Sequence, residues 1–139
     1  MMSPAMLQNF IYALIQVVHN FGAVSVVALA IYGVWRAHLG LPQRRAALFL
    51  AIAWATQVAG GTAFGATSLY FYGHLPDIHG IAVGALFVKI ACAVIGFLTA
   101  AACFKVNSWC SRNPLTAWTA SSVLGAVALS AAAFLRWFS

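Results

Sequence analysis

Apolar residues dominate the chain in four long runs, which short polar connections separate. The runs cover residues 4–35, 46–72, 78–104 and 115–137. A helix needs about 20 mostly apolar residues to cross the hydrocarbon core of a bilayer, and every run reaches that length. The first connection contains the helix breakers Gly40 and Pro42. We therefore predict an all-α integral membrane protein: an antiparallel four-helix transmembrane bundle that forms a single membrane domain over residues 1–139.

The composition favours the same class of protein. Hydrophobic residues make up 64% of the chain and charged residues only 6%, too few to cover the surface of a soluble globule of this size. The net charge of +6 would suggest nucleic acid as a partner of a soluble protein. Because most of the charges lie between membrane spans, we expect the lipid bilayer as the partner and no nucleic acid.

The distribution of charge predicts the orientation in the membrane. Five basic residues follow the first and third runs: Arg36, Arg44, Arg45, Lys105 and Arg112. The only acid, Asp77, lies between the second and third runs, and Arg136 is the one basic residue near a terminus. Cytoplasmic connections are enriched in Lys and Arg. We therefore expect a multi-pass protein of the bacterial inner membrane with both termini outside, N-out and C-out.

The three cysteines argue against a disulfide framework. Cys92, Cys103 and Cys110 are odd in number and form no C-x-x-C pair. The predicted orientation places Cys110 on the cytoplasmic side, where thiols stay reduced. We expect no structural disulfide.

The first run contains strongly polar residues among apolar ones. Gln16, His19 and Asn20 are spaced i, i+3, i+4, so they share one face of a helix, with Tyr12 one turn earlier. Polar side chains inside a membrane usually turn toward the bundle interior. We expect this face to turn away from lipid.

Lys89 in the third run lies at the same predicted depth as His19. His19 precedes Arg36 by 17 residues and Lys89 precedes Lys105 by 16, so each lies roughly 25 Å from the cytoplasmic boundary at ~1.5 Å per residue. Gln57 lies somewhat closer to that boundary. We expect these groups to converge from the first three helices.

Two interpretations of this polar set stay open. His19 alone fits a hydrogen-bonded packing residue. Lys89 has no acid within a span to pair with, so its amine must reach the headgroups, lose its proton, bond to backbone and amide oxygens, or meet an anion. A haem propionate, a quinone carbonyl or a substrate carboxylate would satisfy it. Tyr12, Phe21 and Trp54 are candidates to line such a pocket.

The connection between the second and third runs offers a second set of candidates. His74, Asp77 and His79 form a His-x-x-Asp-x-His pattern that suits a metal ion. The alternative is that Asp77 caps the third helix and the histidines lie at the interface. If a haem binds with His19 as one iron ligand, the second ligand is His79, His74 or a non-histidine group, or the iron is five-coordinate.

Small residues predict close helix packing. Gly61 and Gly65 are four residues apart in the second run, and Gly80 and Gly84 in the third. Such spacing lets helix backbones approach within one chain or between subunits.

The segments 19–23 and 89–95 carry a family resemblance. A first-helix histidine before a glycine-containing apolar run, and a lysine that leads an apolar run in the third helix, resemble the haem-binding protoporphyrinogen oxidase family and the CopD-type copper-resistance membrane domains. The resemblance implies a haem b held near His19 and a functional role for Lys89.

These patterns predict a b-type haem-binding or quinone-interacting membrane subunit in electron transfer. Whether the chain is the membrane redox subunit of an oxidoreductase complex stays open. The cofactor and ligand candidates are His19, Lys89, Gln16, Asn20, Gln57 and Tyr12. The alternatives are a non-catalytic anchoring or accessory subunit, in contact with other membrane subunits or with its own copies, and a transporter of a small anion or metal ion. We find no Ser-His-acid set, carboxylate pair or phosphate loop, which argues against hydrolysis and nucleotide chemistry.

Overall fold

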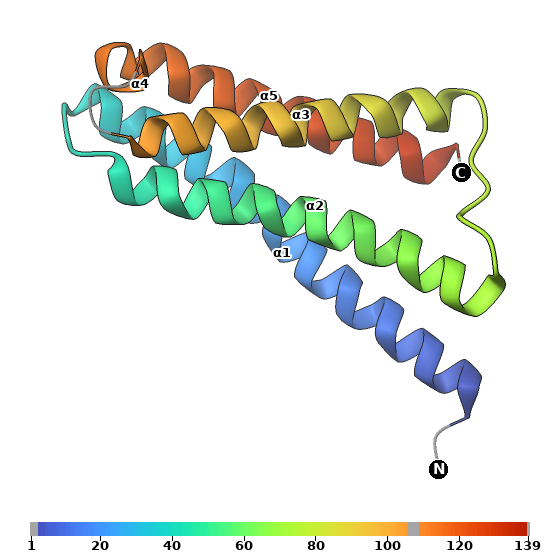
Figure 1. Ribbon diagram of the computed structural model, residues 1–139. Helices are drawn as coiled ribbons and strands as arrows, with labels where there is room; N and C mark the ends of the chain where they lie inside the picture. Colours follow the sequence, from blue (N-terminus) through green and yellow to red (C-terminus); the bar gives the residue numbers. More distant parts are fainter. Residues whose placement is uncertain (1–2, 106–108, 139) are drawn as a thin grey trace.

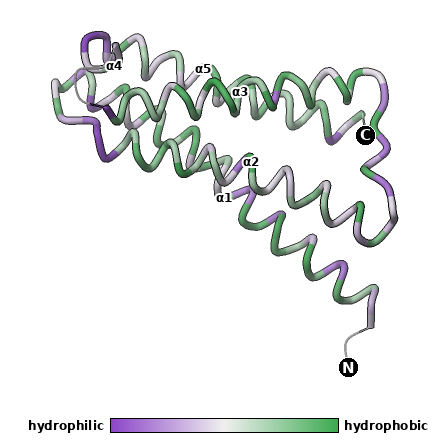
Figure 2. Tube along the Cα trace, viewed as in Figure 1, coloured by the Kyte–Doolittle hydropathy of each residue, from purple (hydrophilic) through white to green (hydrophobic). Residues whose placement is uncertain are grey.

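The structure, a computed structural model, describes residues 3–105 and 109–138, and these residues form helices without a strand (Figure 1). The helices are α1 (Pro4–His38), α2 (Arg44–Tyr72), α3 (Ile81–Phe104), α4 (Trp109–Arg112) and α5 (Pro114–Trp137). The four long helices are each long and apolar enough to cross a membrane. Figure 2 shows apolar residues over most of each long helix, with hydrophilic stretches within α1 and at helix ends. The four predicted spans are confirmed as helices, and they indicate a multi-pass membrane protein.

Local signals set the ends of the first two helices. Ser3 caps α1 by accepting a hydrogen bond from the Met6 backbone N–H at 3.3 Å. The helix continues to His38, three residues beyond the predicted end, and stops before Gly40, whose φ is +64°. Gly73 ends α2 in the left-handed conformation that favours glycine.

Two features of the second half differ from the prediction. The helix α3 begins at Ile81 and not at residue 78, because Gly80 precedes it with a φ of +54°. Asp77 therefore does not cap α3. The connection after α3 contains the short helix α4, which no apolar run predicted. Residues 106–108 of that predicted connection lie outside the described residues.

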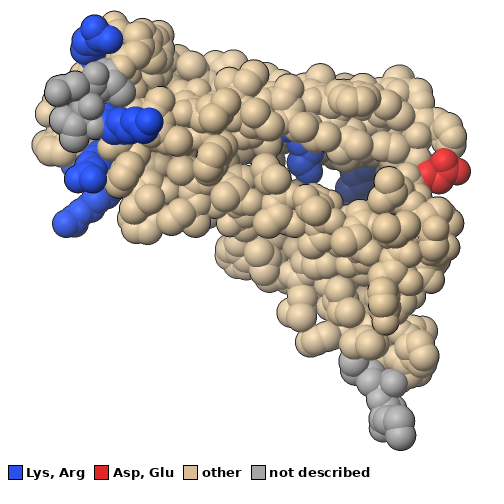
Figure 3. Space-filling view, viewed as in Figure 1, with Lys and Arg blue, Asp and Glu red and all other residues tan. Residues whose placement is uncertain are grey.

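Each long helix packs against two neighbours. The pairs α1 and α2, α2 and α3, α3 and α5, and α5 and α1 are in contact, whereas the diagonal pairs are not in backbone contact within the described residues. The connections after α1 and α3 lie at one end of the molecule, which we call the basic end (Figures 1 and 3). The connection that carries Asp77 lies at the other end, the Asp77 end.

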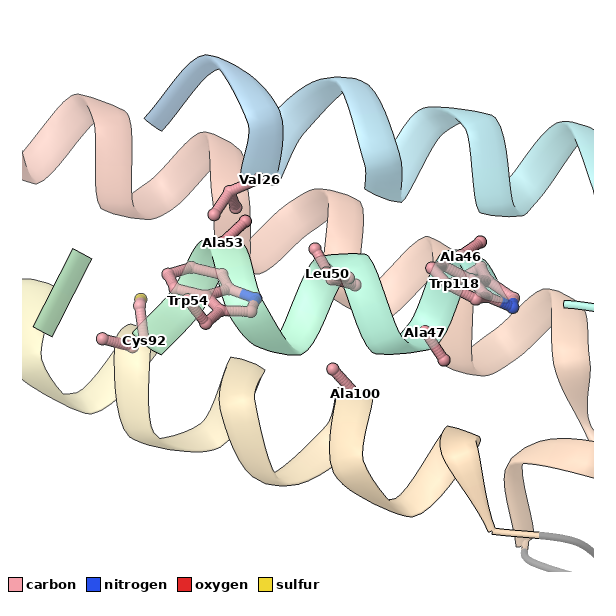
Figure 4. Packing of buried hydrophobic residues seen from close by; sticks show 10 residues of the cluster. Val26, Ala46, Ala47, Leu50, Ala53, Trp54, Cys92, Ala100 and Trp118 are labelled. Carbon is pink, nitrogen blue, oxygen red and sulfur yellow. The ribbon is translucent and has the colours of Figure 1, made fainter. Parts of the chain in front are cut away.

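The buried apolar core lies in the half of the molecule nearer the basic end. Leu50, Trp54 and Trp118 have at most 1% of their surface exposed, and Val26 and Cys92 have at most 5% (Figure 4). Beyond this core, the pair α1 and α2 diverges from the pair α3 and α5 (Figure 1). Figure 3 shows the molecule hollowed between the two pairs, with basic side chains visible inside. We call this opening the cleft.

Two glycines make the core possible. A Cβ atom at Gly96 of α3 would overlap the ring of Trp54, and one at Gly33 of α1 would overlap the ring of Trp118. Each tryptophan ring therefore occupies the space next to a glycine of the neighbouring helix, where any other residue would place its side chain.

The glycines predicted to mediate close packing do not do so within the chain. A Cβ at Gly61, Gly80 or Gly84 would meet nothing within 4 Å, and one at Gly65 would reach only Leu75, at 3.7 Å. Close packing within the chain was wrongly predicted for these positions, because spacing alone does not show which side of a helix faces a neighbour; close packing between subunits stays a prediction. Gly61, for example, is exposed, although its neighbour Gly60 packs against His19.

A disulfide joins Cys103 at the end of α3 to Cys110 in α4. The expectation of no disulfide was therefore wrong. The short helix α4 brings the chain back beside α3, so two cysteines seven residues apart come together without a C-x-x-C motif. Cys92 remains a free, buried thiol.

Candidate functional site

His19 and Lys89 meet in the interior of the bundle. The Nζ atom of Lys89 lies 3.0 Å from Nε2 of His19. The contact crosses between α1 and α3, which are diagonal helices without backbone contact. His19 is 8% exposed and Lys89 is half-buried. The two residues predicted to share one depth are therefore direct partners.

The pair lies where the packed core ends and the cleft begins. Gln57 follows the core residue Trp54 by one turn of α2, and Lys89 precedes the core residue Cys92 by one turn of α3. His19, which contacts both helices, lies at the same level. These side chains therefore form the floor of the cleft.

Two contacts with α2 fix the position of His19. The Nε2 group of Gln57 donates a buried hydrogen bond of 2.7 Å to the backbone carbonyl oxygen of His19. A Cβ at Gly60 would lie 2.5 Å from Nδ1 of the imidazole, so the ring rests on the bare backbone of α2. Nδ1 is buried there and has no hydrogen-bond partner among the described residues. Only the Nε2 side of the ring is open to another group.

The pair carries positive charge without an acid beside it. The only carboxylate side chain of the protein, Asp77, lies in the connection at the far end of the cleft (Figure 3). An ammonium and an imidazolium at 3.0 Å would repel each other strongly in a membrane interior, so the arrangement favours one positive charge shared by the pair. An ammonium has three N–H donors. His19 accepts one, which leaves two for a group inside the cleft.

Aromatic rings form the wall next to His19. Phe64 of α2 meets the imidazole edge-on at a centroid distance of 5.8 Å, and Tyr12 stacks on Phe64 at 6.1 Å. Tyr12 therefore joins the site through Phe64, which the sequence analysis missed. The other two aromatic candidates do not line the cleft floor: Trp54 is buried in the core, and Phe21 is 72% exposed.

Gln16 and Asn20 do not share the buried position of His19. The Nε2 group of Gln16 donates a 2.8 Å hydrogen bond to Oδ1 of Asn20, and both side chains are exposed. They lie three and two turns before Val27, which packs against Gly125 of α5. The amides therefore lie on the side of α1 that meets α5, at a level where α1 and α5 have separated. Of the three polar residues, only His19 is buried; the expectation that their face turns away from lipid stays a prediction.

The histidines of the connection after α2 lie apart from this pair. Nδ1 of His74 lies 2.9 Å from the carbonyl oxygen of Leu75, and Nε2 of His79 lies 3.3 Å from Oδ1 of Asp77. The side chains of His79 and Asp77 are each at least 80% exposed. In residues 3–105 and 109–138, no three His, Cys, Asp or Glu side chains come together in a group that suits a metal ion.

The site can therefore offer N–H donors, an imidazole nitrogen that exchanges a proton, and an aromatic wall, all at the floor of a cleft inside the membrane. Comparison with known proteins found no match among family models, curated proteins or solved structures. The resemblance to haem-binding membrane proteins thus stays a prediction, and the function rests on the chemistry of the site.

Proposed function

We propose that this chain is a quinone-interacting subunit of a bacterial inner membrane and that it takes part in electron transfer. The observation that carries the proposal is the contact between Lys89 and His19 at the floor of the cleft. Ionisable residues inside a membrane are costly, and they usually mark a ligand or a proton pathway.

The donors of the cleft floor match the acceptors of a quinone. A quinone carbonyl oxygen accepts hydrogen bonds, and Lys89 has two N–H donors that His19 does not use. The ring of a quinone is flat and apolar, which suits a place beside Phe64 and Tyr12. The cleft opens between helices, so a lipid-soluble ligand can enter it from the bilayer.

The same pair supplies a path for protons. Reduction of a quinone takes up two electrons and two protons. Lys89 donates to the carbonyl oxygen the one proton that it shares with Nε2 of His19, 3.0 Å away, and water that enters the cleft supplies the second proton and reprotonates Lys89. The electrons come from a redox centre of a partner subunit.

The residues present fit a haem less well than a quinone. A haem iron would have to bind Nε2 of His19, because Nδ1 is closed off by Gly60. Lys89 would then have to leave Nε2 and pair with a propionate. His74 and His79, the predicted second ligands, are engaged in the connection at the Asp77 end.

We further propose that the bundle is antiparallel in the membrane, with both termini outside. Of the seven Lys and Arg side chains, one lies in the last turn of α1 and four follow α1 or α3 along the chain, and the connection after α2 carries the only acid. The positive-inside rule assigns the basic end to the cytoplasm.

Binding of a short-chain quinone to the detergent-purified protein tests the function. We expect saturable binding to the natural chain and at least about tenfold weaker binding to Lys89→Met, because the variant loses a charged hydrogen-bond donor. Lys105→Met is the matched control, since it removes a cation from the end of the same helix, and its affinity should not change.

Two results would contradict the proposal. The first is a natural chain that neither retains quinone on purification nor binds it saturably. The second is an absorption spectrum with a Soret band that Lys89→Met preserves and His19→Leu abolishes, because that result assigns the site to haem.

A second candidate function, an anchoring or accessory subunit, is favoured by Gly84. This glycine is exposed on α3, and a Cβ there would meet nothing within 4 Å. A bare helix surface of this kind lets a helix of another subunit approach closely. If the chain assembles through it, Gly84→Leu should break the assembly seen in mild detergent while the melting temperature of the isolated chain is preserved. An unchanged assembly would remove this candidate.

A further inference from the structure

A cavity at the basic end is separate from the cleft. It has a volume of about 470 Å³ and lies among the start of α2, the end of α3 and the helix α4. Arg44, Phe104 and Lys105 line it, together with the disulfide of Cys103 and Cys110. In the structure, this disulfide joins α3 to α4 beside the cavity.

The cavity has positive charge and no negative charge. Arg44 and Lys105 contribute two cations, and no carboxylate side chain is among the lining residues. The only acid of the chain lies at the Asp77 end, and Figure 3 shows a cluster of basic side chains at the opposite end, apart from those inside the cleft. A cavity of this kind attracts an anion.

The side chain of Arg44 is held in place by a contact with an aromatic ring, and this contact leaves its N–H groups available for hydrogen bonds. Its guanidinium lies over the ring of Phe104, with 4.5 Å between the Cζ atom and the ring centroid. Stacking fixes the plane of a guanidinium and leaves the N–H groups at its edge free to bind oxygen atoms. Arg36 differs, because its Nε donates to the Pro42 carbonyl oxygen at 2.9 Å and its Nη1 to the Tyr32 hydroxyl at 3.0 Å.

Exposed tryptophans indicate the depth of this cavity. Trp35 near the end of α1 is 57% exposed, and Trp109 at the start of α4 is 51% exposed. Tryptophan concentrates at the level of the lipid headgroups. The cavity therefore lies where phosphate groups of lipids are abundant.

We propose that this cavity binds the phosphate group of an anionic ligand, with Arg44 and Lys105 as its ligating side chains. An arginine matches the oxygens of a phosphate with two parallel hydrogen bonds, and a lysine adds a point charge. The phosphate has two sources at this position: the headgroup of an anionic phospholipid, or a soluble phosphate compound.

Native mass spectrometry of the full chain tests the site. The probes are phosphatidylglycerol, phosphatidylcholine and inorganic phosphate, each added to the detergent-purified protein. We expect preferential retention of phosphatidylglycerol or of phosphate, and about fivefold weaker retention for Arg44→Gln and for Lys105→Gln. Arg45→Gln is the matched control, because Arg45 is the neighbouring cation but does not line the cavity.

The outcomes distinguish a lipid headgroup from a soluble phosphate compound, and specific binding from attraction by diffuse surface charge. Phosphatidylglycerol that millimolar phosphate does not displace identifies the lipid, whereas displacement identifies a soluble phosphate compound. Equal losses for Arg44→Gln and Arg45→Gln would overturn the proposal, since diffuse surface charge then accounts for binding. Equal retention of phosphatidylcholine would overturn it as well. A melting curve for each variant separates loss of the ligand from loss of the fold.

Discussion

At the residue scale, the imidazole of His19 occupies space that a side chain at position 60 would fill, and this space is open because residue 60 is glycine. The imidazole has Gly60 on its Nδ1 side, the hydrogen bond from Gln57 at its backbone and Lys89 on its Nε2 side. Three helices therefore determine where one ring lies. Neither the ring nor the ammonium can move far without losing one of these contacts.

The substitution Gly60→Ala tests this dependence. The added Cβ would lie 2.5 Å from Nδ1 of His19, so the ring must shift away from α2. We expect the free energy of unfolding to fall by about 1–3 kcal/mol, as for an overpacked core, and the affinity for quinone to fall with it. Denaturation in detergent and a quinone titration measure the two effects.

The control for this test is Gly61→Ala, one residue further along α2. A Cβ at Gly61 meets nothing within 4 Å, and alanine favours a helix over glycine by about 1 kcal/mol. This variant should be as stable as the natural chain or more stable. If both variants behave alike, Gly60 does not position His19.

Part of the site could be predicted from the sequence. The depth of His19 and Lys89 followed from counting residues to the basic connections, and the structure places the two in contact. Counting gives depth but not direction around the helix axis. For that reason, it did not separate His19 from the exposed Gln16 and Asn20, and it missed Phe64, one turn beyond Gly60.

At the scale of the elements, the helices pack through tryptophans that occupy the space above glycines. Trp54 of α2 packs on Gly96 of α3, and Trp118 of α5 packs on Gly33 of α1. Trp118 is also held by a 2.7 Å hydrogen bond from its Nε1 to the Gln43 side chain. These contacts join the two helix pairs at the basic end.

Gly96→Val should loosen the contact between α2 and α3. The new side chain would occupy the position of the Trp54 ring, which is 1% exposed and has no free space around it. We expect a loss of about 2 kcal/mol or more in the free energy of unfolding. Gly84→Val on the exposed side of the same helix is the control, and its loss should be well under half as large. Thermal denaturation in detergent distinguishes the two.

The sequence predicted the elements better than their contacts. The four long helices followed from apolar length alone, whereas α4 is four residues long and too short to give a periodic pattern. The disulfide of Cys103 and Cys110 was missed for the same reason, because it depends on the turn that α4 makes. The start of α3 was placed three residues early, at Ile78, because Gly80 has a positive φ and the helix begins only after it.

At the scale of the whole molecule, the cluster of cations at the basic end and the opening of the cleft lie at opposite ends. The basic end contains the core, the disulfide and the phosphate cavity, and the other end opens between the helix pairs (Figures 1 and 3). In the proposed orientation, the cleft opens in the outer half of the bilayer.

This orientation makes a prediction about the disulfide. If the basic end faces the cytoplasm, Cys103 and Cys110 should be trapped as thiols when intact cells are quenched with a permeant maleimide, because the cytoplasm keeps thiols reduced. Aerobic purification should then yield the disulfide. A disulfide already present in quenched cells would contradict the orientation. Alkaline phosphatase fused to the C-terminus, active only outside, gives an independent readout.

Photolabelling with an azido-quinone, followed by peptide mass spectrometry, tests most directly the claim that Lys89 and His19 form the ligand site of the cleft. We predict adducts on the α1 segment around Tyr12 and the α2 segment around Phe64, competed by unlabelled quinone and lost in Lys89→Met. Adducts spread over the lipid-exposed surface and unchanged in Lys89→Met would contradict the account.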